Sequence, residues 1–279
     1  MKKITLSNGY EIPVIALGTW EAEGEKGYEA VLCALQNGYD HIDTASAYNN
    51  ETEVGQAIAA SGRKREELFI TSKLWNDVGT YEDTIKAFED SLKRLGLAYL
   101  DLYLIHWPSP SKFRDNWAKR NEAVWSAMED LYKQGKIKSI GVSNFTVEHL
   151  KALKQTWTIK PMINQIRLCP GDTKEELVQY CRAEDIALEA YSPFARGEVF
   201  KSEVLKDIAD SYHKTIGQVI IRWCYQNGWI ALPKSITPER IKSNIAIFDF
   251  VLSKSEMNII KKVHTNYDFN SNNTNETKF

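Results

Sequence analysis

The feature that most constrains the fold is a regular alternation of short apolar runs with longer amphipathic segments. Near the start, Asn8 and Gly9 join two short alternating runs within Ile4–Ile12, which predicts a β-hairpin with positive φ at both turn residues. Runs typical of buried strands then follow at residues 14–17, 39–44, 68–73, 100–106, 137–142, 162–163, 186–191 and 229–232. Helical patterns separate them, at residues 25–36, 51–61, 81–95, 117–134, 146–155 and 174–183, in two stretches around 212–215, and at 238–247 and 255–263.

Eight strands alternating with helices predict an α/β fold, a (β/α)8 TIM barrel with an N-terminal β-hairpin and an extra C-terminal helix. The 279 residues suit such a barrel, which typically needs about 250. A doubly wound open sheet is the alternative, but no Gly-x-Gly-x-x-Gly motif follows the first strand. We therefore predict a single barrel domain over residues 1–279, which ends in a polar, Asn-rich tail at about 265–279.

Composition excludes several classes of partner. A formal net charge of -2 gives no electrostatic reason to expect nucleic acid or an anionic membrane. No apolar run approaches the ~20 residues of a spanning helix, and the polar start is unlike a signal peptide. The four cysteines are scattered, which favours reduced thiols over disulfides or metal ligands. We expect a cytoplasmic monomer that acts on a small molecule and holds no metal.

Polar residues follow or end the predicted strands in a consistent way. They are Asp43, Lys73, His106, Ser143, Asn144, Gln165, Tyr191, Lys234 and Ser235. Taken singly, Lys73 could be a surface lysine, His106 a core histidine, and Ser143 with Asn144 a helix cap. In a barrel, however, the C-terminal strand ends share one face, where active sites are built. The joint pattern therefore favours a functional site.

The charges of this set suggest acid–base chemistry around Tyr48. Asp43 and Lys73 come from neighbouring strands and can pair, which offsets the cost of burying them. A lysine ammonium beside Tyr48 favours the phenolate, so we expect its pKa to fall from about 10 towards the working range. Tyr48 would then donate a proton to an oxygen that gains negative charge, while His106 orients that oxygen. This arrangement suits reduction of a carbonyl.

The motifs of the chain together resemble those of the aldo-keto reductases, from the hairpin to about Val263. They are Gly38–Tyr39, His41–Ala45, Tyr48–Glu51, Thr71–Trp75, Leu104–Pro108, Ile140–Phe145, Asn164–Gln165, Tyr191–Pro193 and Pro233–Ser235 with Arg240 and Asn244. The compact length is similar to that of the bacterial branch with 2,5-diketo-gluconate reductase-like enzymes.

The resemblance implies NADPH-dependent reduction of aldehydes or ketones to alcohols. In such a site Tyr48 is the acid, Asp43 and Lys73 tune it, and His106 orients the substrate. The implied cofactor contacts are Thr19, Asp43, Ser143, Asn144, Gln165, Tyr191, Ser192, Phe194, Lys234, Ser235, Arg240 and Asn244. Among these, Lys234, Ser235 and Arg240 fit a 2′-phosphate, and the loop Ser192–Gly197 would face the pyrophosphate. The implied substrate contacts are Trp20, Tyr48, Trp75, His106 and Trp107; the three tryptophans could instead be core aromatics.

Several positions depart from the family's pattern. Arg167 and Cys169 stand where a glutamate and a histidine are usual, and Phe194 replaces a common leucine. Ser243 stands where many relatives have an acid near the adenine. The C-terminal loop that often trims substrate choice is not recognisable in residues 268–279, so methylglyoxal-like aldehydes, keto-sugars and keto-esters all stay open.

Three other functions compete with carbonyl reduction. A cofactor-binding sensor would keep the nucleotide pocket without turnover, but it would have no use for a tuned phenol. A Schiff-base enzyme could use Lys73, yet the facing Asp43 would keep the amine protonated. A metal enzyme is least favoured, because the five histidines lack paired ligand spacing.

Overall fold

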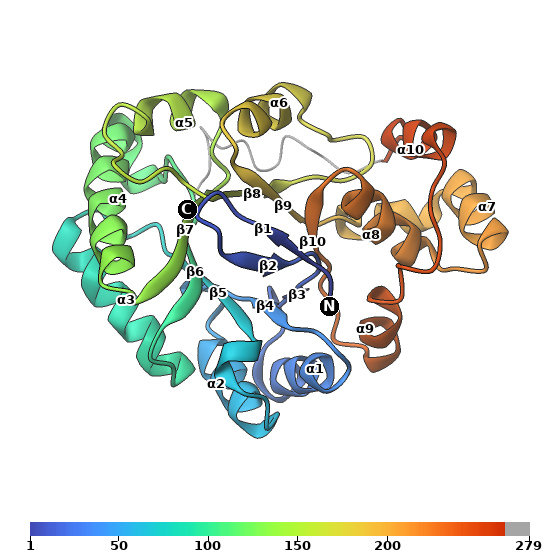
Figure 1. Cartoon of the computed structure of the whole chain (residues 1–279), viewed down its shortest axis with the longest axis horizontal. Coiled ribbons are helices and arrows are strands. Elements are labelled where there is room, and N and C mark those ends of the chain that lie inside the picture. The colour runs from blue at the N-terminus through green and yellow to red at the C-terminus, as the bar shows by residue number, and fades with distance from the viewer. Residues whose placement is uncertain (266–279) are drawn as a thin grey trace.

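A computed structural model of the chain describes residues 1–265 and contains an eight-stranded parallel barrel, seen end-on in Figure 1. Its strands are β3 (Leu17–Gly18), β4 (His41–Asp43), β5 (Phe69–Leu74), β6 (Leu100–Ile105), β7 (Ile137–Ser143), β8 (Ile163–Arg167), β9 (Ala187–Tyr191) and β10 (Trp229–Leu232). Each pairs in parallel with the next, and single bridges from Ile15 to Ala231 and from Gly18 to Lys234 close the ring. The barrel predicted from the alternation is confirmed.

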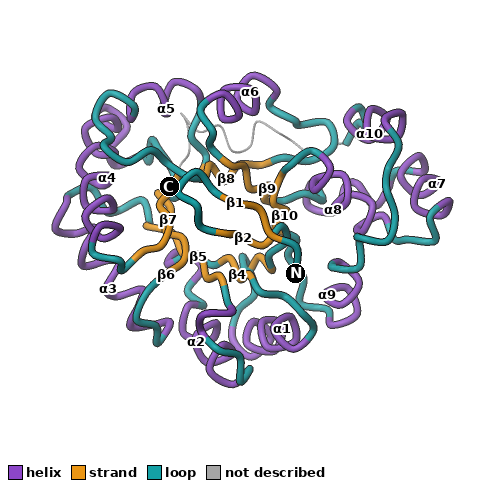
Figure 2. The backbone as a smooth tube through the Cα atoms, in the orientation of Figure 1, coloured by secondary structure: helices purple, strands orange, loops and turns teal. Residues whose placement is uncertain are grey.

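Helices form the outer layer around these strands, as Figure 2 shows. They are α1 (Gly24–Gln36), α2 (Glu51–Ala60), α3 (Tyr81–Leu95), α4 (Trp117–Lys133), α5 (Val147–Leu153), α6 (Glu175–Ala183), α7 (Glu203–Ser211), α8 (Ile216–Gln226), α9 (Pro238–Asn244) and α10 (Lys254–Lys261). The boundaries follow local signals: the Thr146 side chain caps α5, and Pro238 occupies the first turn of α9. Helix α9 ends at Asn244, three residues earlier than its apolar pattern predicts.

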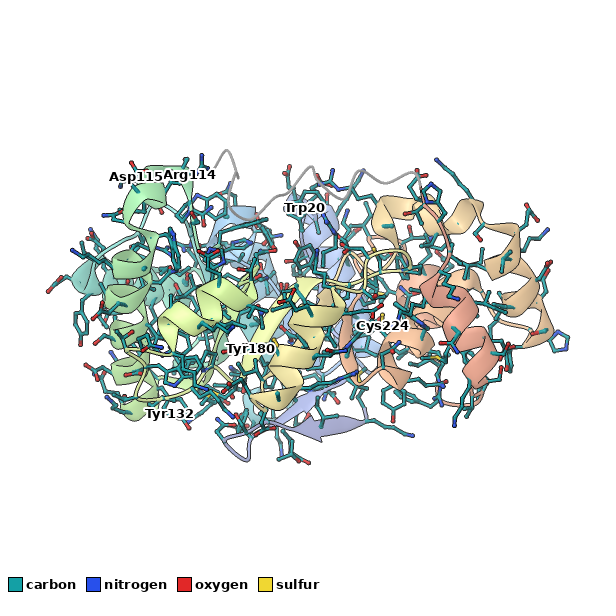
Figure 3. All side chains as sticks on the ribbon, turned by 90° about the horizontal axis from the view of Figure 1, so that it is seen from above. Trp20, Arg114, Asp115, Tyr132, Tyr180 and Cys224 are labelled. Carbon is teal, nitrogen blue, oxygen red and sulfur yellow. The ribbon has the colours of Figure 1, made fainter. Side chains whose placement is uncertain are left out.

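The N-terminal hairpin covers the end of the barrel opposite the functional face. Its strands β1 (Lys3–Thr5) and β2 (Glu11–Pro13) pair with Ile4 opposite Ile12. Figure 3 shows the hairpin at one end of the molecule and Trp20 at the other. The predicted turn geometry is wrong in one respect, because Gly9 has a positive φ of 83° but Asn8 does not. The Asn8 side chain instead accepts a hydrogen bond from the Tyr10 backbone at 3.1 Å, which stabilises a longer loop.

Strand alternation separates a polar interior near the functional face from an apolar outer layer. Asp43, Lys73, Gln165 and Glu189 meet one another inside the barrel, although they come from four different strands. On the opposite face of the strands, residues such as Ile42 belong to the apolar core beneath the helices. The fold therefore gathers charged side chains in a space sealed by apolar packing.

Two expectations lie beyond this description. The single-domain organisation stays a prediction, and the expected polar tail and the altered C-terminal loop fall almost wholly outside the described residues 1–265. Within that part of the chain, no helix has the length and apolar character needed to cross a membrane.

Candidate active site

A buried ion pair forms the floor of the site. Lys73, fully buried on β5, places its Nζ 2.6 Å from Asp43 Oδ1 and donates to the Thr44 backbone oxygen at 2.9 Å. Burial by itself would lower the lysine pKa, but Asp43, together with Tyr48 and Glu189, outweighs it and raises that pKa. Lys73 therefore stays charged, which argues against a Schiff-base nucleophile at this position.

Tyr48 lies directly above this pair. The short 3-10 turn Ser46–Tyr48 brings its hydroxyl to 3.4 Å from Lys73 Nζ. The expected net fall of its pKa is wrong: burial raises the pKa, and the opposing effect of Lys73 does not overcome it. The phenol therefore keeps its proton at neutral pH. Lys73 is still the group that would stabilise the phenolate once the proton has left.

His106 completes the acid–base set at the end of β6. Its ring packs edge-on against Tyr48, with centroids 5.7 Å apart, and against Trp75 at 5.2 Å. Burial, followed by the charge of Lys73, holds the imidazole pKa well below its usual value, so the ring is neutral. The Asn144 amide donates to the His106 backbone oxygen at 3.0 Å and fixes this strand end. A neutral imidazole can donate a hydrogen bond to an oxygen that faces Tyr48.

Amide and hydroxyl groups line the neighbouring strand ends. Ser143 Oγ donates to the Gln165 backbone oxygen at 2.9 Å, and Tyr191 donates to Asn144 Oδ1 at 2.7 Å. Gln165 Nε2 donates at 2.8 Å to both Asp43 and Glu189, so its carbonyl oxygen is the part left to accept from a ligand. This side of the cleft therefore offers acceptor oxygens, which suit the N–H groups of a carboxamide.

The cleft above these residues has a volume of about 960 Å³, near the upper end of the ~300–1,000 Å³ of small-molecule sites. The predicted residues that line it are Trp20, Asp43, Tyr48, Trp75, His106, Trp107, Ser143, Asn144, Gln165, Tyr191, Ser192, Phe194, Lys234, Ser235, Arg240 and Asn244. Thr19 differs: it is buried beneath the cleft, and its hydroxyl donates to the Asp43 backbone oxygen at 3.1 Å. Lys73 likewise lies under the lining, with its Nζ 3.4 Å from the Tyr48 hydroxyl.

Two cations that line the cleft are available for a ligand. Within residues 1–265, neither Lys234 nor Arg240 has an ion-pair partner. Ser235 lies between them in sequence, and its hydroxyl accepts from the Thr237 backbone at 3.1 Å. Two unpaired cations that line the same cleft suit a phosphate group.

Several lining residues were not predicted from the sequence. They are Gly18, Glu21, Ala47, Phe200, Thr215, Gly217 and Leu232. The loop 192–197 after β9 lines the cleft as expected, but one contact of it was not predicted: Arg196 has φ 52° and its guanidinium lies 5.0 Å from the Trp20 ring centroid. That contact joins segments about 175 residues apart, and no local sequence pattern predicts it. The Gly197 that follows, with φ 96°, was the available signal for a sharp turn.

Two of the four residues that depart from the family's pattern lie outside the cleft. Arg167 is buried and donates through Nε to Asp172 at 2.8 Å. Cys169 is also buried, which raises its pKa to about 12 and keeps it a thiol. Neither lines the cleft, whereas Phe194 and Ser243 do. The described residues contain no group of three His, Cys, Asp or Glu side chains placed to hold a metal ion.

Comparison with known proteins decides the family. The model of the aldo/keto reductase family matches residues 14–265. The chain belongs to this family. As an aldo-keto reductase, it is an oxidoreductase acting on carbonyl groups, and the resemblance in its motifs is confirmed.

Bacterial relatives are similar over almost their full length. A glyoxal reductase of Bacillus subtilis (strain 168) is 49% identical over 258 residues, which are 92% of this chain and 91% of that protein. The methylglyoxal reductase DkgA of Escherichia coli (strain K12) is 43% identical over 262 residues, 93% and 92% of the two chains. The crystal structure of a Bombyx mori aldo-keto reductase in complex with NADP superposes with a TM-score of 0.88 at 38% identity, covering 97% of this chain and 96% of that one.

Proposed function

We propose that this aldo-keto reductase uses NADPH to reduce small aldehydes and ketones to alcohols, with Tyr48 as proton donor. One observation carries the proposal: Lys73 Nζ is held 2.6 Å from Asp43 and 3.4 Å from the Tyr48 hydroxyl, on the floor of a deep cleft. Two similar bacterial proteins, named glyoxal reductase and methylglyoxal reductase, support a small carbonyl as substrate.

The donors and acceptors of the cleft fit the parts of the cofactor. The Gln165 carbonyl oxygen would accept from the carboxamide N–H groups, and the Ser143 and Asn144 oxygens are further acceptors beside it, since their own hydrogens are donated within the protein. Tyr191 offers its ring for stacking. Lys234 and Arg240 suit the 2′-phosphate that distinguishes NADPH from NADH. When bound, the reduced nicotinamide supplies a hydride to the carbonyl carbon.

Two side chains of the protein, those of His106 and Tyr48, bind the carbonyl oxygen of the substrate, and Lys73 and Asp43 support Tyr48. The neutral His106 ring donates a hydrogen bond that fixes the oxygen beside Tyr48. As the oxygen gains negative charge, Tyr48 transfers its phenolic proton to it, so that an alcohol forms. Lys73 then stabilises the phenolate, and Asp43 keeps Lys73 charged and in place. The phenol regains a proton from solvent before the next turnover.

Aromatic walls shape the substrate side of the cleft. Trp75 and Trp107 lie near His106, and Trp20 stands at the rim, where 39% of its surface is exposed. Flat apolar walls around one polar corner suit compact carbonyls, because the reactive oxygen then has one place to go. Methylglyoxal-like aldehydes, keto-sugars and keto-esters are the classes to compare.

A panel of these carbonyls, followed by loss of NADPH absorbance with NADH run alongside, tests the proposal. We expect turnover of at least one small aldehyde or ketone and a preference for NADPH. Tight NADPH binding without turnover of any member would contradict a reductase and favour a cofactor-binding sensor.

Removing one cation should weaken the binding of NADPH but not that of NADH. Arg240→Ala deletes a charge that faces the phosphate end of the cleft, so KM for NADPH should rise about tenfold. KM for NADH should hardly change, because NADH lacks the 2′-phosphate. Steady-state kinetics with both cofactors measure this, with the exposed Lys242→Ala on the same helix as a charge-matched control. An equal loss with both cofactors would place Arg240 elsewhere on the nucleotide.

We also propose a monomeric cytoplasmic protein without a nucleic-acid partner. The net charge of -2 supports the last point. The four cysteines, all free thiols, suit a reducing compartment. Light scattering of the purified protein measures the oligomeric state, and a dimer mass would contradict the proposal.

A further inference from the structure

One buried carboxyl group beneath the cleft has no role in the chemistry described above. Glu189 is fully buried in the middle of β9, between Leu188 and Ala190, which are buried as well. An acid in such a position is costly unless hydrogen bonds or a cation compensate it. Its surroundings therefore show what it does for the protein.

Glu189 is joined to the acid–base set through one amide. Gln165 Nε2 donates to Glu189 Oε2 at 2.8 Å, and the same nitrogen donates to Asp43 Oδ2 at 2.8 Å. The other oxygen of Asp43 binds Lys73 Nζ, which lies 3.4 Å from the Tyr48 hydroxyl. A continuous polar chain thus runs from Glu189 to the phenol.

The charged neighbours of Glu189 do not neutralise a negative charge on its carboxyl group. Asp43 and Lys73 face it from β4 and β5, and Lys73 is already paired with Asp43. His41 Nε2 lies 3.8 Å from Glu189 Oε1, but burial lowers the pKa of that imidazole to about 3, so it is neutral. The adjoining strand β10, Trp229–Leu232, offers apolar side chains. Two carboxyl groups therefore share one cation.

The outcome is a carboxyl that holds its proton at neutral pH. Burial first, then the charge of Asp43, raises the pKa of Glu189 to about 8. In the protonated form it accepts from Gln165 without adding charge to the site. In the ionised form it places a second negative charge beside Asp43, which favours the protonated form of Tyr48.

We propose that Glu189 is a positioning residue of the reductase site, which acts through the Gln165 amide to aim its carbonyl oxygen at the cofactor and to hold Asp43 against Lys73. The inference rests on the function proposed above. Without Glu189, one Gln165 N–H loses its acceptor and the amide is held by its bond to Asp43 alone. The carboxamide contact and the alignment of Asp43 would then weaken together.

Two variants of Glu189 separate its hydrogen bond from its charge. Glu189→Leu removes both, and we expect NADPH affinity and kcat each to fall about tenfold. Glu189→Gln keeps an acceptor for Gln165 but cannot ionise, so it should restore both within about threefold. In the alcohol-oxidation direction Tyr48 must accept a proton, so the alkaline rise of kcat in Glu189→Gln should move to lower pH by about one pH unit.

Readouts without turnover keep this inference distinct from the proposed function. NADPH affinity is measured by quenching of tryptophan fluorescence. Infrared difference spectra at pH 7 should show a protonated carboxyl band that Glu189→Gln lacks. Glu129→Gln is the control, since Glu129 is a buried acid of α4 that binds the 158–159 backbone far from this network, and it should change neither readout.

The same two variants can contradict the proposal. If Glu189→Leu is folded and binds NADPH with parental affinity, Glu189 does not position Gln165. If Glu189→Leu does not fold, Glu189→Gln decides: an unchanged infrared band and an unchanged pH profile overturn the proposal. Failure of the parent protein to reduce any carbonyl, with both spectroscopic results as expected, would instead count against the reductase assignment alone.

Discussion

Tyr48→Phe is expected to lower kcat for carbonyl reduction by about 10²–10⁴-fold while leaving NADPH affinity near that of the parent. The substitution removes only the hydroxyl 3.4 Å from Lys73 Nζ, so it deletes the proton donor and keeps the ring that packs against His106. Because burial raises the phenol pKa, the parent should hold its reduction rate steady through neutral pH. Single-turnover rates with saturating NADPH measure the effect directly.

The matched control is Tyr28→Phe, which removes a hydroxyl on α1 outside the cleft and should keep the parental rate. A Tyr48→Phe variant that reduces small aldehydes at the parental rate would assign the proton to another donor. His106 would then be the first candidate, since its ring faces the same space. Loss of NADPH binding in Tyr48→Phe would show that the variant disturbed the cleft instead.

Acid is expected to destabilise the fold well above the pKa of most carboxyl groups. Burial lowers the pKa of His41 to about 3 and of His149 to about 4, and that of His106 lies well below its usual value. The pKa of each of these histidines is about 6.5 in the unfolded chain. Below pH 6.5 the unfolded state therefore binds protons that the folded state does not bind. Stability is therefore lost as pH falls through 6.5, by about 2 kcal/mol per histidine at pH 5.

Glu189 opposes this loss, because its raised pKa makes the folded state the better proton binder between about 4.5 and 8. Between pH 7 and pH 5 it offsets part of the loss from the three histidines, and the free energy of unfolding still falls, because three groups oppose one. Urea unfolding at the two pH values measures the difference.

His149→Gln is the variant that tests this prediction most directly. His149 completes a capping box with Thr146, and glutamine is a usual residue at that place, so the cap is kept while the titration is removed. The loss on going to pH 5 should shrink by about 2 kcal/mol. An unchanged loss would mean that His149 does not titrate with unfolding.

Parallel strand ends made the pairing of Asp43 with Lys73 predictable, since consecutive strands bring such residues to one face whatever the loops do. The barrel followed from the same alternation. The turn at Asn8 did not, because its side chain bonds the Tyr10 backbone in place of the conformation that the Asn-Gly pair favours. The Asn-Gly pair correctly predicted a hairpin, but the hydrogen bond of the Asn8 side chain determined the geometry of its turn.

The errors at the site have a different cause. The direction of the Tyr48 pKa depends on how completely the fold removes water, which a list of neighbouring charges does not contain. Glu189 looked like one residue of a buried strand, although its position two before Tyr191 puts it on the same strand face. Arg196 reaches Trp20 only after the loop has folded back over the cleft.

The most direct test of carbonyl reduction at this cleft follows deuterium into the alcohol. Parent protein is given a small aldehyde with NADPH deuterated at the reactive carbon of the nicotinamide in ordinary water, then with ordinary NADPH in deuterium oxide. We expect one deuterium on the alcohol carbon in the first case and none on that carbon in the second, because the oxygen alone receives its hydrogen from Tyr48 and solvent. Deuterium on that carbon only in the second case would contradict the central claim.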